Sequence, residues 1–163
     1  MGEITLRAVR NDDWSALLEL AHLSLSELPI VPSQQEWMDN RRSFSPSDGI
    51  QHHFVATSGE RIVGYAGLER RNTAPEGWYR LFVVVAPSAR ATLGTMLLAK
   101  LRERLISLDA RHAWVMELAA DAGFLSYLGQ VGFVRSNTIN LEDGIPAVQL
   151  TMDAPFQSLV QPA

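Results

Sequence analysis

Residues 83–98, VVVAPSARATLGTMLL, constrain the fold more than any other stretch of the chain. A run of β-branched residues ends at Pro87, and a few residues later a helix begins that is apolar on one face. The run predicts a strand buried on both faces, and the apolar face predicts a helix packed on the sheet. The first turn of a helix that follows a strand in this way offers backbone N–H groups to an anion. We therefore expect an α/β protein in which residues 83–98 form a phosphate-binding unit of strand, short loop and helix N-terminus.

Composition places the chain among folded soluble proteins. The 163 residues are enough for one domain with a buried core, and 47% of them are hydrophobic while 20% are charged. A net charge of −4 argues against a nucleic-acid-binding surface. The chain has no cysteine, which excludes disulfides and thiolate chemistry. Since no secretory leader and no run long enough to cross a bilayer are found, we expect a cytoplasmic protein with no membrane partner.

Hydrophobic periodicity predicts one domain over residues 1–153 and a loosely held tail over residues 154–163. The expected order of elements is β-α-α-β-β-β-α-β-α-β-β, which implies a mixed sheet with helices on both faces. The strands on either side of the long helix should be parallel. The expected strands are residues 4–9, the two arms of a hairpin over 52–70, and residues 78–85, 113–119, 133–141 and 147–152. The expected helices are residues 14–25, 33–41, 94–108 and 123–131.

The central stretch resembles the acyl-CoA-binding motif of the GNAT superfamily of acyl-CoA-dependent N-acyltransferases. In that family a strand ending V-x-P is followed by Arg or Gln, a glycine-rich turn and a helix with paired leucines. The matching residues are Val85, Pro87, Arg90, Gly94, Leu97 and Leu98. Residues 121–133, DAGFLSYLGQVGF, are similar to a second family feature, an aromatic-bearing helix that ends in Gly-Phe. The resemblance implies the GNAT fold for nearly the whole chain.

The resemblance also implies a function. It points to an N-acetyltransferase that passes an acetyl or other acyl group from acetyl-CoA to a primary amine by direct attack. The expected partner is a small-molecule or peptide amine, and a homodimer is left open. No metal is expected, because adjacent His52 and His53 face opposite ways on a strand and no cysteine completes a site. The implied cofactor-binding residues are Val83, Val84, Val85, Arg90, Ala91, Thr92, Leu93, Gly94 and Thr95.

The phosphate-binding turn departs from the family pattern R/Q-x-x-G-x-G/A. It reads RATLGT, which puts Leu93 and Thr95 at the small positions. Anchoring on the paired leucines instead implies a one-residue deletion before Gly94. Arg90 is then either a phosphate ligand or an exposed arginine at a helix start. Gly94 either lets the backbone approach a ligand or lets the helix pack closely on the sheet.

The catalytic positions depart from the family as well. Tyr79 stands where the family often has a general-base glutamate, and Leu128 stands where it often has an acid tyrosine, with Tyr127 next to it. The candidate catalytic residues are Tyr79, Glu76 and Tyr127, with Glu69 and His53 as further candidate bases. Trp37 and Phe44 lie in the segment that shapes acceptor specificity in the family. Two alternatives to an enzyme stay open: an acyl-CoA-binding or regulatory module without turnover, and a subunit that contributes only an interface.

Overall fold

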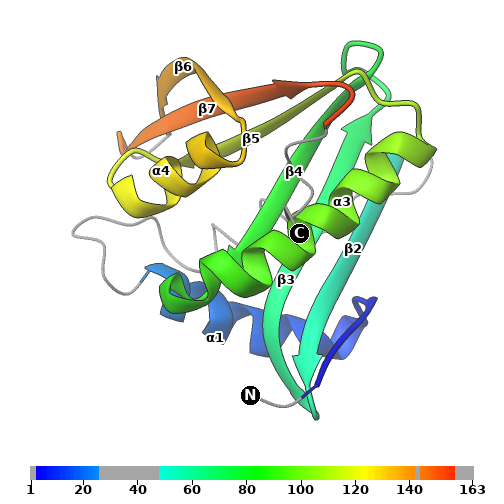
Figure 1. Ribbon diagram of the computed structural model, residues 1–163, viewed down its shortest axis with the longest axis vertical. Helices are drawn as coiled ribbons and strands as arrows, with labels where there is room; N and C mark the ends of the chain where they lie inside the picture. Colours follow the sequence, from blue (N-terminus) through cyan, green and yellow to red (C-terminus); the bar gives the residue numbers. More distant parts are fainter. Residues whose placement is uncertain (1–2, 26–47, 142–143, 157–163) are drawn as a thin grey trace.

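The computed structural model describes residues 3–25, 48–141 and 144–156. These residues form one seven-stranded sheet with the strand order β1-β2-β3-β4-β5-β7-β6. Helix α1 covers one face, and α3 and α4 cover the other (Figure 1). The expected mixed sheet with helices on both faces is thus confirmed. The helix expected over residues 33–41 lies outside the described residues.

The described elements lie within a few residues of their expected positions. No helix among them is long and apolar enough to cross a membrane. The helices are α1 (Trp14–Leu25), α3 (Thr95–Ser107) and α4 (Ala122–Gln130). The strands are β1 (Ile4–Ala8), β2 (Gly49–Ser58), β3 (Arg61–Arg71), β4 (Trp78–Val85), β5 (His112–Leu118), β6 (Val134–Asn140) and β7 (Pro146–Asp153).

Strands β4 and β5 are parallel, as a crossover through α3 requires, and they separate soon after they meet. Their ladder consists of the pairs Trp78–His112, Tyr79–Ala113 and Arg80–Trp114. Beyond this point the two strands diverge (Figure 1), although β4 stays paired with β3 as far as Val85. Among the described strands, none pairs with the side of β4 that faces β5 over residues 81–85. We call the opening between residues 81–85 of β4 and 115–118 of β5 the wedge.

Alternation along β4 feeds two hydrophobic cores. Residues 81, 83 and 85 face α3, while Phe82 and Val84 face α1. All five are buried, which confirms the expectation that the end of this strand is buried on both sides. The leucine stripe of α3, residues 97, 98, 101 and 105, is also fully buried, so it is a core face.

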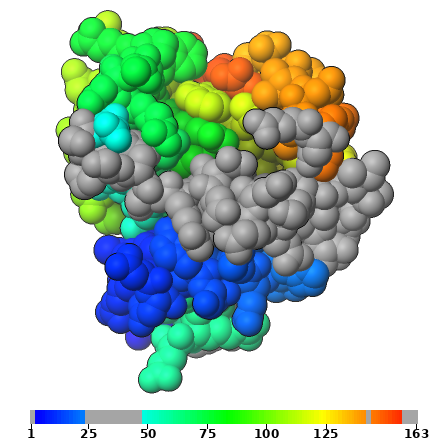
Figure 2. All heavy atoms as spheres, turned by 180° about the vertical axis from the view of Figure 1, so that it is seen from behind, coloured from blue at the N-terminus to red at the C-terminus, as the bar shows by residue number. Residues whose placement is uncertain are grey.

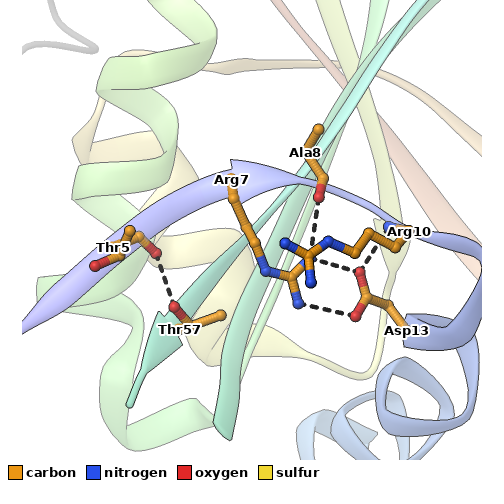
Figure 3. Close-up of polar contacts among 6 residues, drawn as sticks. All are labelled: Thr5, Arg7, Ala8, Arg10, Asp13 and Thr57. Carbon is orange, nitrogen blue, oxygen red and sulfur yellow. Dashed lines mark hydrogen bonds and ion pairs between the residues drawn. The ribbon is translucent and has the colours of Figure 1, made fainter. Parts of the chain in front are cut away.

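An ion pair fixes the start of α1 against β1 (Figure 3). The two terminal nitrogens of Arg7 donate to the two carboxylate oxygens of Asp13 at 2.8 and 2.9 Å, and the Arg10 N–H donates to the same carboxylate at 2.7 Å. The hydrogen bond from Arg7 lowers the pKa of Asp13. Asp13 thus anchors the start of α1 to the sheet.

The described part of the C-terminal tail is packed rather than loosely held. Phe156 is 2% exposed and belongs to the core under α3. Arg102 Nε donates to the Phe156 carbonyl at 3.0 Å. The Phe156 ring packs in this core and holds residues 154–156 against α3. Residues 157–163 lie outside the described residues.

Candidate functional site

The chain is helical almost from the end of β4. Pro87–Ala89 form a 3₁₀ turn, and Arg90–Gly94 form a π-helical turn that continues directly into α3. In a π-helix each N–H bonds to the carbonyl five residues earlier, so the N–H groups at its start have no π-helical partner. The Arg90 N–H donates to the Pro87 carbonyl and the Thr95 N–H to the Thr92 carbonyl, which leaves residues 91–93 as the candidate anion-binding N–H groups. The turn expected before the helix is therefore itself helical, and this helix N-terminus lies at the open end of the wedge.

Gly94 does not use the conformational freedom of glycine. Its φ of −58° lies in the ordinary right-handed region. A Cβ at this position would lie 3.4 Å from the Tyr127 hydroxyl oxygen. The three atoms nearest to such a Cβ all belong to Tyr127 of α4, at ordinary van der Waals distances, so Gly94 faces α4 rather than the sheet.

The side chains of this turn face in different directions. Leu93 is buried in the core, whereas Ala91 and Thr92 are exposed. The Thr95 hydroxyl donates to the Ala91 carbonyl at 3.0 Å, so in its 2.8 Å contact with Tyr127 the tyrosine is the donor. Burial raises the pKa of Tyr127, so the tyrosine keeps its proton at neutral pH. The hydroxyl of Tyr127, one of the candidate catalytic residues, therefore reaches the start of α3.

Arg90 is joined to α4 as well. Its two terminal nitrogens donate to the Asp121 carboxylate at 3.0 and 2.6 Å, and its Cζ lies 4.6 Å from the centre of the Phe124 ring. Asp121 also accepts from the Phe124 N–H at 3.2 Å and so caps α4. The Arg90 side chain is 13% exposed, so it is not the exposed helix-start arginine of one sequence interpretation. Its terminal nitrogens are engaged within the protein.

The structure does not gather Tyr79, Glu76 and Tyr127 at one point. Tyr79 is 5% exposed and lies in the core on the α3 side of the sheet. Glu76 is exposed in the loop before β4, at the end of that strand remote from the open end of the wedge. Leu128, at the family's acid position, is fully buried.

A second set of polar side chains borders the wedge, three of them at its narrow end and Glu117 on its β5 side. Arg80 and Trp114 form the last pair of the β4–β5 ladder, and Glu69 is the neighbour of Arg80 on β3. Glu69 and Glu117 are 8% and 9% exposed. Burial lowers the pKa of Arg80, and the negative charges of Glu69 and Glu117 oppose that effect. We call Glu69, Arg80, Trp114 and Glu117 the Arg80 cluster.

His53 forms a neutral polar pair with Tyr65 on the same sheet. His53 Nδ1 lies 2.8 Å from the Tyr65 hydroxyl and Nε2 lies 3.3 Å from Gln51 Oε1. Burial lowers the pKa of His53 to about 4, with a smaller contribution from His52. Because Gln51 Oε1 can only accept, Nε2 carries the proton of the neutral ring and Tyr65 donates to Nδ1. Gly67 leaves room for this ring, since a Cβ there would lie 2.7 Å from Nδ1.

The comparison with protein families now decides the classification. Residues 33–154 match the model of the acetyltransferase (GNAT) domain. The chain belongs to the GNAT acetyltransferase family. A search of curated proteins found no significant match.

Solved structures of GNAT proteins share the fold. The N-acetyltransferase of Staphylococcus aureus Mu50 is 15% identical, with a TM-score of 0.68 over 93% of this chain and 99% of that one. The ribosomal-protein-S18-alanine N-acetyltransferase of Escherichia coli is 16% identical, with a TM-score of 0.67 over 99% and 97%. A Salmonella typhimurium protein described as an acetyltransferase, whose structure contains acetyl-CoA, is 14% identical, with a TM-score of 0.62 over 92% and 93%.

Sequence reasoning about this GNAT domain missed part of the Arg80 cluster. Glu69 and His53 were candidate bases, but Arg80 and Glu117 were not singled out. The available signal was a charged residue inside an otherwise apolar strand, in WYRLFVVV and in AWVMELA. Trp37 and Phe44 lie outside the described residues. Figure 2, seen from the α1 side, shows α1 in blue below the green and yellow-green surface of β4 and β5.

Proposed function

We propose that this GNAT domain transfers an acetyl group from acetyl-CoA to a primary amine of a small molecule or a peptide. The observation that carries the proposal is the wedge, which has a helix N-terminus at its open end and two buried carboxylates beside it. An unpaired strand edge and the N–H groups at the start of a helix suit a ligand with both amide and diphosphate groups.

The described residues fit such a donor. The pantetheine arm of acetyl-CoA carries amides that can pair with the β4 backbone of Val83, Val84 and Val85, as an added strand would. The diphosphate suits the N–H groups of residues 91–93 and the positive end of the α3 dipole. Arg90, engaged by Asp121, holds this turn in position and does not need to contact the phosphates.

Acetyl-CoA would supply an acetyl group activated as a thioester. The amine nitrogen forms a bond to the carbonyl carbon while the carbon–sulfur bond breaks, the amine loses a proton and the thiolate gains one. Backbone N–H groups of β4 that face the wedge can stabilise the oxyanion. Glu69 and Glu117, both buried beside the wedge, can attract the ammonium form of the acceptor and take its proton through water.

Tyr127 remains the candidate proton donor for the thiolate. Its hydroxyl reaches the start of α3 from α4, and Tyr127 keeps its proton at neutral pH because burial raises its pKa. Tyr79 and Glu76 receive less support, because the first is a core residue and the second is an exposed loop residue remote from the open end of the wedge.

Free-thiol release from acetyl-CoA in the presence of a panel of primary amines tests this function. We expect release that depends on an added amine, together with an acetylated product of the expected mass. CoA should also raise the melting temperature, whereas adenosine alone should not. CoA binding without amine-dependent release would favour the non-catalytic module, and no binding at all would contradict both.

A further inference from the structure

Arg80 is a partly buried cation with one hydrogen-bond donor that the described residues do not use. It lies in the middle of β4, and its Nε is inaccessible to solvent and has no hydrogen-bond partner among the described residues. Its Cζ lies 4.7 Å from the centre of the Phe82 ring and 5.0 Å from that of Trp114. Ring faces attract a positive charge, but they do not accept an N–H hydrogen bond as an oxygen does. A buried donor without a partner is costly, so the arrangement suits a site that an outside acceptor completes.

The charges around Arg80 define the chemistry of that ligand. Glu69 lies beside Arg80 on β3, and the charges of both Glu69 and Glu117 act on the guanidinium. The Arg80 cluster therefore holds one positive and two negative groups. The two carboxylates attract an ammonium group, while the Arg80 guanidinium attracts an oxyanion. A ligand with both groups matches the cluster better than a simple amine does.

The position of Arg80 places this ligand on the face of the sheet opposite the turn that is proposed to hold acetyl-CoA. Arg80 alternates with Tyr79 and Leu81, so it lies on the same face of β4 as Phe82 and Val84, which pack toward α1. The turn at residues 90–94 leads into α3, which covers the opposite face. A donor held by that turn and an acceptor held by Arg80 would thus meet at the wedge from opposite faces of the sheet.

We propose that Arg80 binds an anionic group of the acceptor, so that the preferred substrate carries a carboxylate or a similar oxyanion in addition to its amine. The amine then lies in the wedge, near the buried carboxylates. This inference rests on the proposed acetyl transfer and narrows its substrate class. The anionic group can belong to a free amino acid or to an acidic side chain near the N-terminus of a peptide, since both present a carboxylate close to an amine.

Matched acceptors test the inference. The first set pairs L-amino acids with their carboxamides, and the second pairs short peptides that have Asp or Glu at the second position with peptides that have Asn or Gln there. We expect kcat/KM to be at least about tenfold higher for the carboxylate member of the pairs in one set, as one charge-assisted hydrogen bond predicts. The set that shows the difference identifies the source of the carboxylate.

Variants of Arg80 link the preference to this residue. In Arg80→Gln the carboxylate preference should fall below about threefold, and Arg80→Lys should restore part of it because the charge is kept. Arg135→Gln is the matched control, since Arg135 is exposed on β6. It should leave the preference unchanged. Equal rates for acidic and neutral acceptors, or a preference that survives in Arg80→Gln, would overturn the inference.

A binding measurement keeps the inference independent of turnover. In protein labelled with ¹⁵N at arginine, the Arg80 Nε–H signal is the one lost in Arg80→Lys. We expect L-amino acids, added together with CoA, to shift that signal, and their carboxamides to leave it in place. If no amine is acetylated but the signal shifts, the proposed function fails and the anion site stands. If neither amino acids nor acidic peptides shift the signal, the anion site is wrong.

Discussion

Arg90 and Asp121 join the first turn of the α3 region to the first turn of α4, through nitrogen–oxygen distances of 3.0 and 2.6 Å. The two side chains are 13% and 11% exposed. A charged pair this well buried is expensive to break from one side, because the remaining charge is left without its partner. The pair therefore ties the proposed phosphate-binding turn to the helix that carries Tyr127.

Removing Arg90 should destabilise the fold. We expect Arg90→Ala to lower the free energy of unfolding by about 3 kcal/mol, since Asp121 keeps only the Phe124 N–H as a partner. Urea unfolding of Arg90→Ala, Asp121→Asn and the double variant should give a coupling energy of about 1–3 kcal/mol. The exposed Lys100–Glu103 pair, 3.2 Å apart, is the control and should give below about 0.5 kcal/mol. Additive effects at Arg90 and Asp121 would show that the pair does not act as a unit.

The Arg90–Asp121 pair should also affect the affinity for CoA. If Arg90 positions the turn, Arg90→Ala and Asp121→Asn should each weaken CoA by about tenfold, because helical N–H groups lose their alignment. A pantetheine fragment, which has no diphosphate, should bind both variants as it binds the parent protein. Calorimetric titration at one salt concentration measures the affinity of the parent protein and of each variant for both ligands. Weakening by Arg90→Ala alone, with Asp121→Asn unchanged, would instead assign a direct phosphate contact to Arg90.

Two glycines should differ in their tolerance of a methyl group. A Cβ at Gly67 would lie 2.7 Å from His53 Nδ1, whereas at Gly94 it would lie 3.4 Å from the Tyr127 hydroxyl. Gly67→Ala should cost about 1–3 kcal/mol of stability, and Gly94→Ala should be neutral or stabilising by up to about 1 kcal/mol. Gly94→Leu must displace Tyr127 and should again cost about 1–3 kcal/mol. Thermal unfolding of the three variants decides the order, and equal costs for the two alanine variants would be inconsistent with these distances.

His53 should make stability depend on pH. Its pKa is about 4 in the folded protein against an ordinary value of 6.5. Between these values the unfolded chain binds a proton that the folded protein excludes, so stability is complete above pH 6.5 and falls as the pH drops toward 4. The shift corresponds to a loss of about 3 kcal/mol.

Denaturant unfolding at pH 8 and at pH 4.5 isolates this contribution. The loss of stability between the two should be smaller in His53→Gln, which does not titrate, than in the parent protein. His22→Gln, at an exposed position on α1, should behave like the parent. An unchanged pH dependence in His53→Gln would mean that His53 is not held neutral in the fold.

The fold was predictable from local patterns, whereas the site was predictable only in part. The β-branched run of β4 and the leucine stripe of α3 fix their elements, since both patterns have the period of the structure they form. The wedge begins where the β4–β5 ladder stops, and the sequence of neither strand indicates that position. The Arg90–Asp121 contact and the Arg80 cluster likewise join residues far apart in the sequence. Periodicity carries no information about such pairs.

The most direct test of the account is a crystal structure of the protein with acetyl-CoA. We predict that the pantetheine arm pairs with the backbone of Val83, Val84 and Val85, and that the diphosphate accepts hydrogen bonds from N–H groups of residues 91–93. Arg90 should still be paired with Asp121. A ligand bound elsewhere, or a wedge that stays empty at saturating acetyl-CoA, would contradict the account.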